Sequence, residues 1–188
     1  MQYSCIVMGV SAGGLHALSF LLEKLPKAYP IPVLIVQHRS KDQVELLEEL
    51  LANRCQITIR QANEKEKINS GIVYLAPPAY HLLVESDQTL SLSSDEHVIS
   101  KPSIDILFES AAEVFKEKLI GIVLTGANND GSKGITVINK FGGLTIAQQT
   151  EEAQYPYMPQ AAINTGKVNF IWSLPEIQKF LLELPLKK

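Results

Sequence analysis

Three residues that could form a hydrolytic triad each lie in a loop after an apolar run of strand length. Ser11 comes directly after the run Cys5 to Val10, and His38 directly follows Val33 to Gln37. Asp130 lies in the loop after a later run of this kind. If the three runs are parallel strands of one sheet, these side chains emerge at its carboxyl edge, where open α/β sheets place their ligands and chemistry. A hydroxyl, an imidazole and a carboxylate at one edge could serve as nucleophile, base and orienting group.

The glycine-rich loop around Ser11 has two interpretations. The segment Gly9-Val10-Ser11-Ala12-Gly13-Gly14 joins a predicted strand to a predicted helix. Its glycines permit a tight turn, and the amino terminus of the helix offers backbone N–H groups to an anionic oxygen. Such a loop suits a nucleophilic serine or a bound phosphate, and the motif alone does not separate them. Against a dinucleotide, Ser11 occupies the middle glycine position, where a side chain obstructs a pyrophosphate.

His38 and Asp130 also have structural alternatives. A histidine after a buried strand is often only a satisfied polar group, and an aspartate in an Asn-Asn-Asp-Gly junction is often a helix cap. The combination favours the triad, because all three residues leave predicted strands at the same end. In it, Asp130 is expected to bind Nδ1 of His38 and leave Nε2 facing Ser11. The remaining histidines are expected to be structural or exposed: His16, His81 and His97.

Apolar runs alternate with segments of helical periodicity along most of the chain. This repetition predicts an α/β fold with a doubly wound, mostly parallel sheet and helices on both faces, a Rossmann-like three-layer arrangement. The short runs between residues 72 and 92 predict an antiparallel excursion at one edge of the sheet, with hairpin-length connections. The non-periodic segment from Gln149 to Gln160 predicts a loop that overhangs the site. The expected helices cover about 15–25, 44–51, 103–116, 132–141 and 174–182.

Composition restricts the function classes. The 188 residues, 46% hydrophobic and 20% charged, fit a single domain spanning 1–188. The net charge of −3 gives no basic field for nucleic acid, and no stretch approaches the length of a membrane span. Cys5 and Cys55 are expected to be buried thiols, and the amino terminus carries no secretory signal. A cytoplasmic protein with no nucleic-acid partner and no membrane insertion is therefore expected.

Six motifs follow one another along the chain: Gly-Val-Ser-Ala-Gly-Gly at 9–14, Gln37-His38, Tyr-Leu-Ala-Pro at 74–77, Lys-Pro-Ser-Ile-Asp-Ile-Leu-Phe at 101–108, Leu-Thr-Gly with Asn-Asp-Gly at 124–131, and Met158-Pro159 with Ala-Ile-Asn at 162–164. Together they resemble the catalytic domain of the CheB family of chemotaxis protein-glutamate methylesterases. The resemblance runs from about Ile6 to Trp172, nearly the whole chain.

This resemblance implies a serine hydrolase without a cofactor or metal. The family removes methyl esters from glutamate side chains of chemoreceptor-type proteins, and some members also deamidate receptor glutamines. By resemblance, Ser11 is the nucleophile, His38 the general base and acid, and Asp130 the orienting carboxylate. The backbone N–H groups of Ala12 and Ala127 are the candidate oxyanion donors. Further candidates for contact with the substrate are Gln37, Arg39 and Met158.

The chain departs from the family pattern beside the reacting centre. The family usually has threonine where this chain has Ala12, and Gly-Met-Gly where it has Gly126-Ala127-Asn128. We expect altered specificity or rate rather than inactivity, because the triad positions are intact. Family members commonly carry an amino-terminal receiver domain, and the short segment before the first strand implies that such gating is absent. A separate regulatory chain is then a candidate partner.

Two other functions compete with hydrolysis. A non-catalytic or altered-specificity CheB-like binding module would keep the scaffold to hold receptor helices, since fold is a poor guide to retained chemistry. A nucleotide-binding Rossmann-type domain would use the glycine loop. Against the latter, the second predicted strand ends in Gln37-His38 and not in an acidic residue that binds a ribose.

Overall fold

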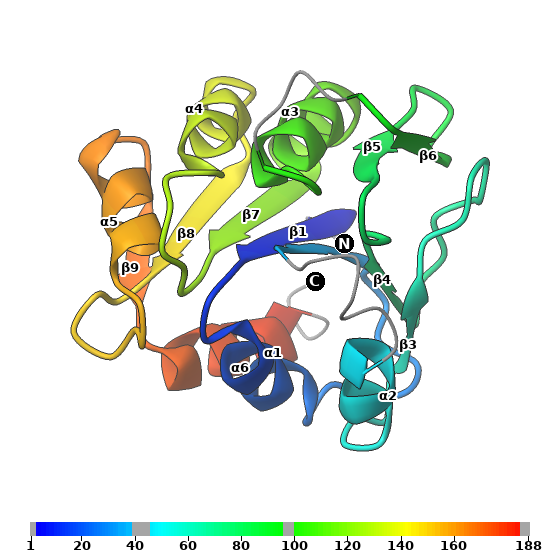
Figure 1. Ribbon diagram of the computed structural model, residues 1–188, viewed down its shortest axis with the longest axis horizontal. Helices are drawn as coiled ribbons and strands as arrows, with labels where there is room; N and C mark the ends of the chain where they lie inside the picture. The colour runs from blue at the N-terminus through cyan, green and yellow to red at the C-terminus, as the bar shows by residue number, and fades with distance from the viewer. Residues whose placement is uncertain (1–2, 39–45, 96–99, 185–188) are drawn as a thin grey trace.

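A seven-stranded sheet lies between two layers of helices in the computed structural model, which describes residues 3–38, 46–95 and 100–184 (Figure 1). The strand order is β3-β4-β2-β1-β7-β8-β9, and every neighbouring pair in this sheet is parallel. The strands are β1 (Cys5–Val10), β2 (Val33–Gln37), β3 (Thr58–Gln61), β4 (Ile72–Leu75), β7 (Leu119–Val123), β8 (Leu144–Gln148) and β9 (Phe170–Trp172).

The helices are divided between the two faces of the sheet. In Figure 1, α3 and α4 lie above the sheet, and α1, α2 and α6 lie below it. Helix α5 lies at the β8 and β9 end, and a short 3₁₀ helix (Lys116–Lys118) follows α3. The α-helices are α1 (Gly14–Leu22), α2 (Leu46–Ala52), α3 (Ile104–Phe115), α4 (Ser132–Lys140), α5 (Tyr157–Asn164) and α6 (Leu174–Glu183). The predicted doubly wound α/β fold is thereby confirmed.

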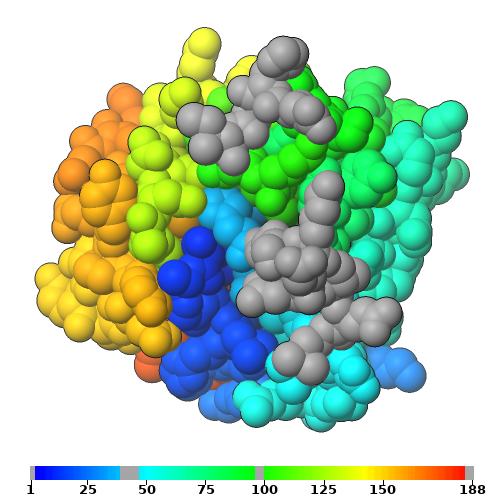
Figure 2. Space-filling model, in the orientation of Figure 1, coloured from blue at the N-terminus to red at the C-terminus, as the bar shows by residue number. Residues whose placement is uncertain are grey.

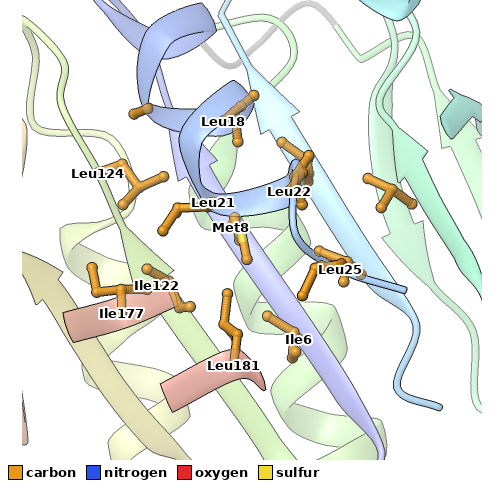
Figure 3. Close-up of a cluster of buried hydrophobic side chains, with 14 of the residues drawn as sticks. Ile6, Met8, Leu18, Leu21, Leu22, Leu25, Ile122, Leu124, Ile177 and Leu181 are labelled. Atoms are coloured by element: carbon orange, nitrogen blue, oxygen red, sulfur yellow. The ribbon is translucent and has the colours of Figure 1, made fainter. Parts of the chain in front are cut away.

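Strand β1 is buried on both faces because both helical layers pack against it. Ile6 and Met8 point toward α1 and α6, where they join the cluster drawn in Figure 3. Cys5 and Val7 belong to the second core cluster, on the α3 side. Strands covered on both faces are continuous apolar runs without alternation, as this one is. From α1, Leu21 reaches the same cluster and is fully buried.

The middle of the chain corrects one prediction and confirms another. Strand β4 is not part of an antiparallel excursion, because it pairs in parallel with both β3 and β2 inside the main sheet. Strands β5 (His81–Val84) and β6 (Leu90–Ser93) do form the expected antiparallel hairpin, as a separate two-stranded sheet that packs on α3. The segment β4 occupies is apolar on both faces, which indicates an interior strand.

The segment predicted as an overhanging loop is only partly a loop. Residues 149–156 connect β8 to helix α5, which begins at Tyr157 and includes three buried residues: Met158, Pro159 and Ala162. A helix this short presents too few residues for its periodicity to stand out. The expected start of the second helix, Val44, lies outside the described residues. None of the described helices has the length and apolar character needed to cross a membrane.

Candidate active site

The register of the sheet brings Ser11 and His38 side by side. Val10 and Gln37 are partners across the β1–β2 ladder, and the His38 N–H donates to the Val10 carbonyl at 3.1 Å. Ser11 and His38 are the next residues on adjacent strands, which lie about 4.8 Å apart in any sheet. In Figure 2 the blue segment after β1, the light-blue end of β2 and the yellow-green segment after β7 border one another on one face.

The backbone of the Ser11 loop is held by Thr125, just after β7. The Ser11 N–H donates to the Thr125 carbonyl at 3.0 Å, and the Thr125 hydroxyl donates to the Ala12 carbonyl at 3.0 Å. Gly13 has a φ of 78°, and a Cβ there would lie 2.8 Å from the Gln154 side-chain oxygen. Only glycine adopts this conformation readily and leaves that space free. The glycine-rich sequence is therefore needed to turn the chain sharply into α1.

The Asp130 carboxylate lies at the amino terminus of α3 and is 7% exposed. One oxygen accepts from the Ile104 N–H at 2.8 Å and from His38. The other accepts from the N–H groups of Asp105 (2.9 Å) and Gly131 (3.1 Å) and from the Ser103 hydroxyl (3.2 Å). The helix amino terminus suits an anion because its N–H groups are free and its dipole is positive. Asp130 therefore reaches across the sheet edge to cap a helix and to bind the imidazole.

These contacts favour the ionised form of Asp130. Burial alone would raise its pKa, but the hydrogen bonds from His38 and from the Asp105 and Ile104 N–H groups hold the pKa below its ordinary value. Hydrogen bonds to a carboxylate stabilise the charged form. A neighbouring carboxyl behaves oppositely: burial, together with the nearby charge of Asp130, raises the pKa of Asp105 to about 6. The ring of His38 is thus in contact with a full negative charge.

The imidazole orientation differs from the one predicted. His38 Nε2, and not Nδ1, lies 2.8 Å from Asp130 Oδ2. Nδ1 faces Asn128, whose side-chain nitrogen is 3.0 Å away. The prediction was wrong because it followed the usual triad, in which the carboxylate binds Nδ1, whereas here the ring presents Nε2 to Asp130 and Nδ1 to Asn128.

Asn128 was missed as a site residue. From the sequence it was only a departure from the family pattern, with no role of its own. Its location could have marked it as a site residue, because it lies two residues before Asp130 in the loop that leaves β7. Its side-chain amide can also donate and accept hydrogen bonds at the same time.

Backbone N–H groups near Ser11 are available to an anionic oxygen. Among the hydrogen bonds of the described residues, the N–H groups of Ala12 and Ala127 have no acceptor. The Gly126 N–H, in contrast, donates to the Tyr155 carbonyl at 2.9 Å. The N–H groups of Gly13, Asn128 and Asn129 likewise have no acceptor among these hydrogen bonds, so Ala12 and Ala127 remain candidates by resemblance.

Ser11 and His38 line one open cleft of about 630 Å³. Gln37, a candidate for contact with the substrate, also lines it, and its side-chain oxygen is buried with no hydrogen-bond partner among the described residues. Arg39, the second such candidate, lies outside the described residues. The other residues lining the cleft are Ala12, Gly13, Gly14, Leu15, His16, Arg54 and Gln154.

Met158 does not line the cleft and is fully buried. Its sulfur lies under Gly126, where an added Cβ would come within 2.6 Å of it. Position in the sequence placed Met158 near the site, but the turn of α5 directs its side chain inward. It packs against Gly126 in the loop after β7. A separate apolar pocket of about 390 Å³ opens beside this loop, lined by Ala127, Tyr155, Pro156, Tyr157 and Gln160.

The remaining histidines and the cysteines lie in different settings. His81 is fully buried, with Nε2 on the Asp95 carbonyl (3.0 Å) and Nδ1 accepting from the Ser103 N–H (3.1 Å), so it is structural. His16 is exposed on α1, and His97 lies outside the described residues. Cys5 is buried and Cys55 is partly exposed, both as free thiols. The described part of the chain has no group of three or more His, Cys, Asp and Glu side chains that could hold a metal.

Comparison with known proteins identifies the family. The CheB methylesterase family model matches residues 6–181. A putative protein-glutamate methylesterase/protein-glutamine glutaminase of Leptospira interrogans is 46% identical, over 98% of this chain and 96% of its own length. A probable protein-glutamate methylesterase of Borreliella burgdorferi is 36% identical over 96% of this chain, which spans 49% of that protein.

The fold comparison agrees with the sequence comparison. The crystal structure of the Thermotoga maritima CheB methylesterase catalytic domain matches with a TM-score of 0.93 and 29% identity, over 98% of this chain and 100% of that one. The fold is that of a hydrolase catalytic domain. The chain belongs to the CheB methylesterase family, and the resemblance found in its motifs is confirmed.

Proposed function

We propose that the protein hydrolyses methyl esters on glutamate side chains of chemoreceptor-type proteins, with Ser11, His38 and Asp130 as its catalytic residues. The observation that carries the proposal is the position of His38. Its ring is bound to a buried carboxylate at 2.8 Å, and its backbone lies beside Ser11 across the β1–β2 ladder. Two relatives are named protein-glutamate methylesterases, which supports methyl esters of protein glutamates as the substrate class, and the family resemblance suggests chemoreceptors as their source.

In the proposed first step, Ser11 Oγ attacks the ester carbonyl and its proton passes to His38 Nδ1. The carbonyl becomes a tetrahedral oxyanion, which the N–H groups of Ala12 and Ala127 can stabilise. The imidazolium then gives its proton to the methoxide oxygen, and methanol leaves. An acyl-enzyme remains, with the substrate glutamyl group joined to Ser11 as an ester.

The second step repeats the same proton transfers with water. His38 takes a proton from the attacking water, and the tetrahedral intermediate collapses to release Ser11, which regains its proton. The product is a glutamate carboxylate. Asp130 stays ionised throughout and stabilises the imidazolium that forms in both steps. A glutamine substrate would follow the same route with ammonia as the leaving group, which matches the glutaminase part of the relatives' names.

The departures at Ala12 and Ala127 are compatible with this mechanism. The oxyanion donors belong to the backbone, so neither a threonine hydroxyl nor a methionine side chain is required at these positions. What the smaller side chains change is the space around the substrate. This supports a catalytic role over a non-catalytic binding module, for which the free N–H groups beside Ser11 would have no use.

The proposal is tested by methanol release from methylated receptor fragments, together with labelling by a fluorophosphonate probe. We expect the wild-type protein to release methanol and to be labelled at Ser11, while Ser11→Ala and His38→Ala are inactive and unlabelled. Ser4→Ala is the matched control, because Ser4 is exposed at the opposite end of β1. A folded wild-type protein that releases no methanol and takes no label would overturn the proposal.

A further inference from the structure

Asn128 is held so that its amide orientation is determined. The Asp130 backbone N–H donates to Asn128 Oδ1 at 3.1 Å. Since an N–H group can only donate, the atom that receives it must be the amide oxygen. The amide nitrogen of Asn128 therefore faces His38, where it lies 3.0 Å from Nδ1.

This contact determines the protonation of the imidazole. Asn128 Nδ2 is a donor only, so His38 Nδ1 must present its lone pair. Nε2 faces the ionised carboxylate of Asp130, which accepts only, so Nε2 carries the proton. A ring turned over about its Cβ–Cγ bond would place carbon atoms at both positions and lose both hydrogen bonds. Asn128 and Asp130 together therefore select one orientation and one tautomer.

The hydrogen bond from Asn128 also occupies the His38 nitrogen that would act as the base. A neutral imidazole has one lone pair, and in this tautomer it lies on Nδ1, the nitrogen that would take the Ser11 proton. Within residues 3–38, 46–95 and 100–184, the Ser11 hydroxyl makes no hydrogen bond, while Nδ1 accepts from Asn128. Ser11 and Asn128 compete for one acceptor.

We infer that Asn128 is a positioning residue that keeps His38 in the productive tautomer but restrains the enzyme at rest, because Ser11 must displace it from Nδ1 before the proton can move. The inference rests on the proposed function. It concerns this chain in particular, since the glycine implied by the family resemblance at this position has no side chain to make either contact.

The first test compares Asn128→Ala and Asn128→Gly with wild type in the rate of fluorophosphonate labelling and in the hydrolysis of a small methyl ester. We expect labelling and kcat to rise about two- to tenfold, the range that one neutral hydrogen bond is worth, with KM unchanged. Asn129→Ala is the matched control, because this neighbouring asparagine is exposed, and it should behave as wild type.

A second variant predicts the opposite sign. In Asn128→Asp, a carboxylate replaces the donor opposite Nδ1, and it binds only a protonated nitrogen. Labelling of Ser11 should fall below the wild-type rate. A merely structural role for Asn128 would move the alanine and aspartate variants in the same direction. Equal labelling of wild type and all variants, or a fall in the alanine and glycine variants, would overturn the inference.

The protonation state is measured independently of activity by ¹⁵N NMR of protein labelled in histidine. We expect the neutral His38 ring of the wild-type protein to carry its proton on Nε2, with the Nδ1 resonance changed in Asn128→Ala and unchanged in Asn129→Ala. A proton on Nδ1 at rest would overturn the inference even in an active enzyme. A wild-type protein that takes no label would overturn the proposed function instead, and the NMR result would then decide the Asn128 contact alone.

Discussion

Asp130 and Ser11 lie at the same edge of the sheet but differ in how their polar atoms are satisfied. The Asp130 carboxylate accepts from His38, the Ser103 hydroxyl and three backbone N–H groups, and it is nearly inaccessible to water. Ser11 is bound only through its backbone, and its hydroxyl makes no hydrogen bond among the described residues.

This difference in hydrogen bonding distinguishes a fixed part of the site, at Asp130, from a part that is free to react, at Ser11. A buried charge is tolerable only with full hydrogen bonding, so the contacts of Asp130 contribute to stability in addition to its proposed role in chemistry. In the proposed mechanism the Ser11 hydroxyl forms and breaks a covalent bond, and contacts that held it at rest would have to be lost in the reaction. Substitutions at the two residues should therefore separate activity from stability.

The largest expected effect on activity is that of Ser11→Ala. Loss of a catalytic serine lowers kcat by a factor of about 10⁶ in a well-studied serine hydrolase. Because the hydroxyl makes no hydrogen bond among the described residues, the free energy of unfolding should change by less than about 0.5 kcal/mol. Methanol release and urea denaturation of the same preparation test both parts. A clearly destabilised variant would contradict the proposed difference between the two residues.

Asp130→Asn should damage both properties. We expect kcat to fall by about 10⁴, as the imidazole loses the carboxylate that orients it. The new amide nitrogen also faces N–H donors, and each buried group left without a partner costs about 1–3 kcal/mol. Urea denaturation should show a lower midpoint than that of Ser11→Ala. If the two variants were equally stable, Asp130 would not hold the amino terminus of α3 as described.

Met158→Ala tests the support under the loop after β7. Truncating this fully buried side chain should lower the free energy of unfolding by about 2–5 kcal/mol. Met158→Leu keeps the volume and should cost less than about 1.5 kcal/mol. Because Met158 contacts Gly126 and not the cleft, KM for a small ester should change little in either variant. A raised KM in the leucine variant would instead place Met158 at the substrate.

The smallest effect concerns Asp105. Burial and the charge of Asp130 raise its pKa from 3.8 to about 6, so the folded protein holds a proton there that the unfolded chain has released. The folded state therefore binds more protons than the unfolded one between about pH 4 and 6, and this group makes stability fall as pH rises through that window.

Asp105→Asn removes this dependence but keeps a side-chain oxygen that can accept from the Gly134 N–H, now 2.8 Å from Oδ1. The variant should gain stability relative to wild type as pH rises from about 4 to 6 and keep the gain above. Urea midpoints measured from pH 4 to 8 test this. A difference between the two proteins that does not vary with pH would show that Asp105 titrates at its ordinary value.

Much of the site could be predicted because it depends on backbone geometry. Polar residues that directly follow apolar runs buried on both faces must emerge at the carboxyl edge of a parallel sheet. That reasoning placed Ser11 and His38 correctly in one cleft. The same reasoning was not applied to strand β4, because the turn residues Pro77-Pro78 suggested a hairpin. Its burial on both faces instead places it inside the parallel sheet.

The features of the site that were not predicted depend on the direction of individual side chains. The spacing of residues along the sequence does not determine that direction. The ring nitrogen that meets Asp130 follows from the path of one side chain across the edge. Asn128 acquires its contact because the turn before Asp130 folds its amide back toward His38. Met158 lies on the buried side of α5, together with Pro159 and Ala162. In all three cases the segment was located correctly, and only the orientation of the side chain was not predicted.

The pairing of Val10 with Gln37 has a practical consequence for the proposed enzyme. Ser11 and His38, the proposed nucleophile and base, each lie one residue beyond this pair of central strands. The distance between them is therefore set by the pairing of β1 with β2 and not by a hinge or a flexible lid. Heating should therefore leave their spacing intact until the sheet itself melts, so that inactivation coincides with cooperative unfolding and does not precede it.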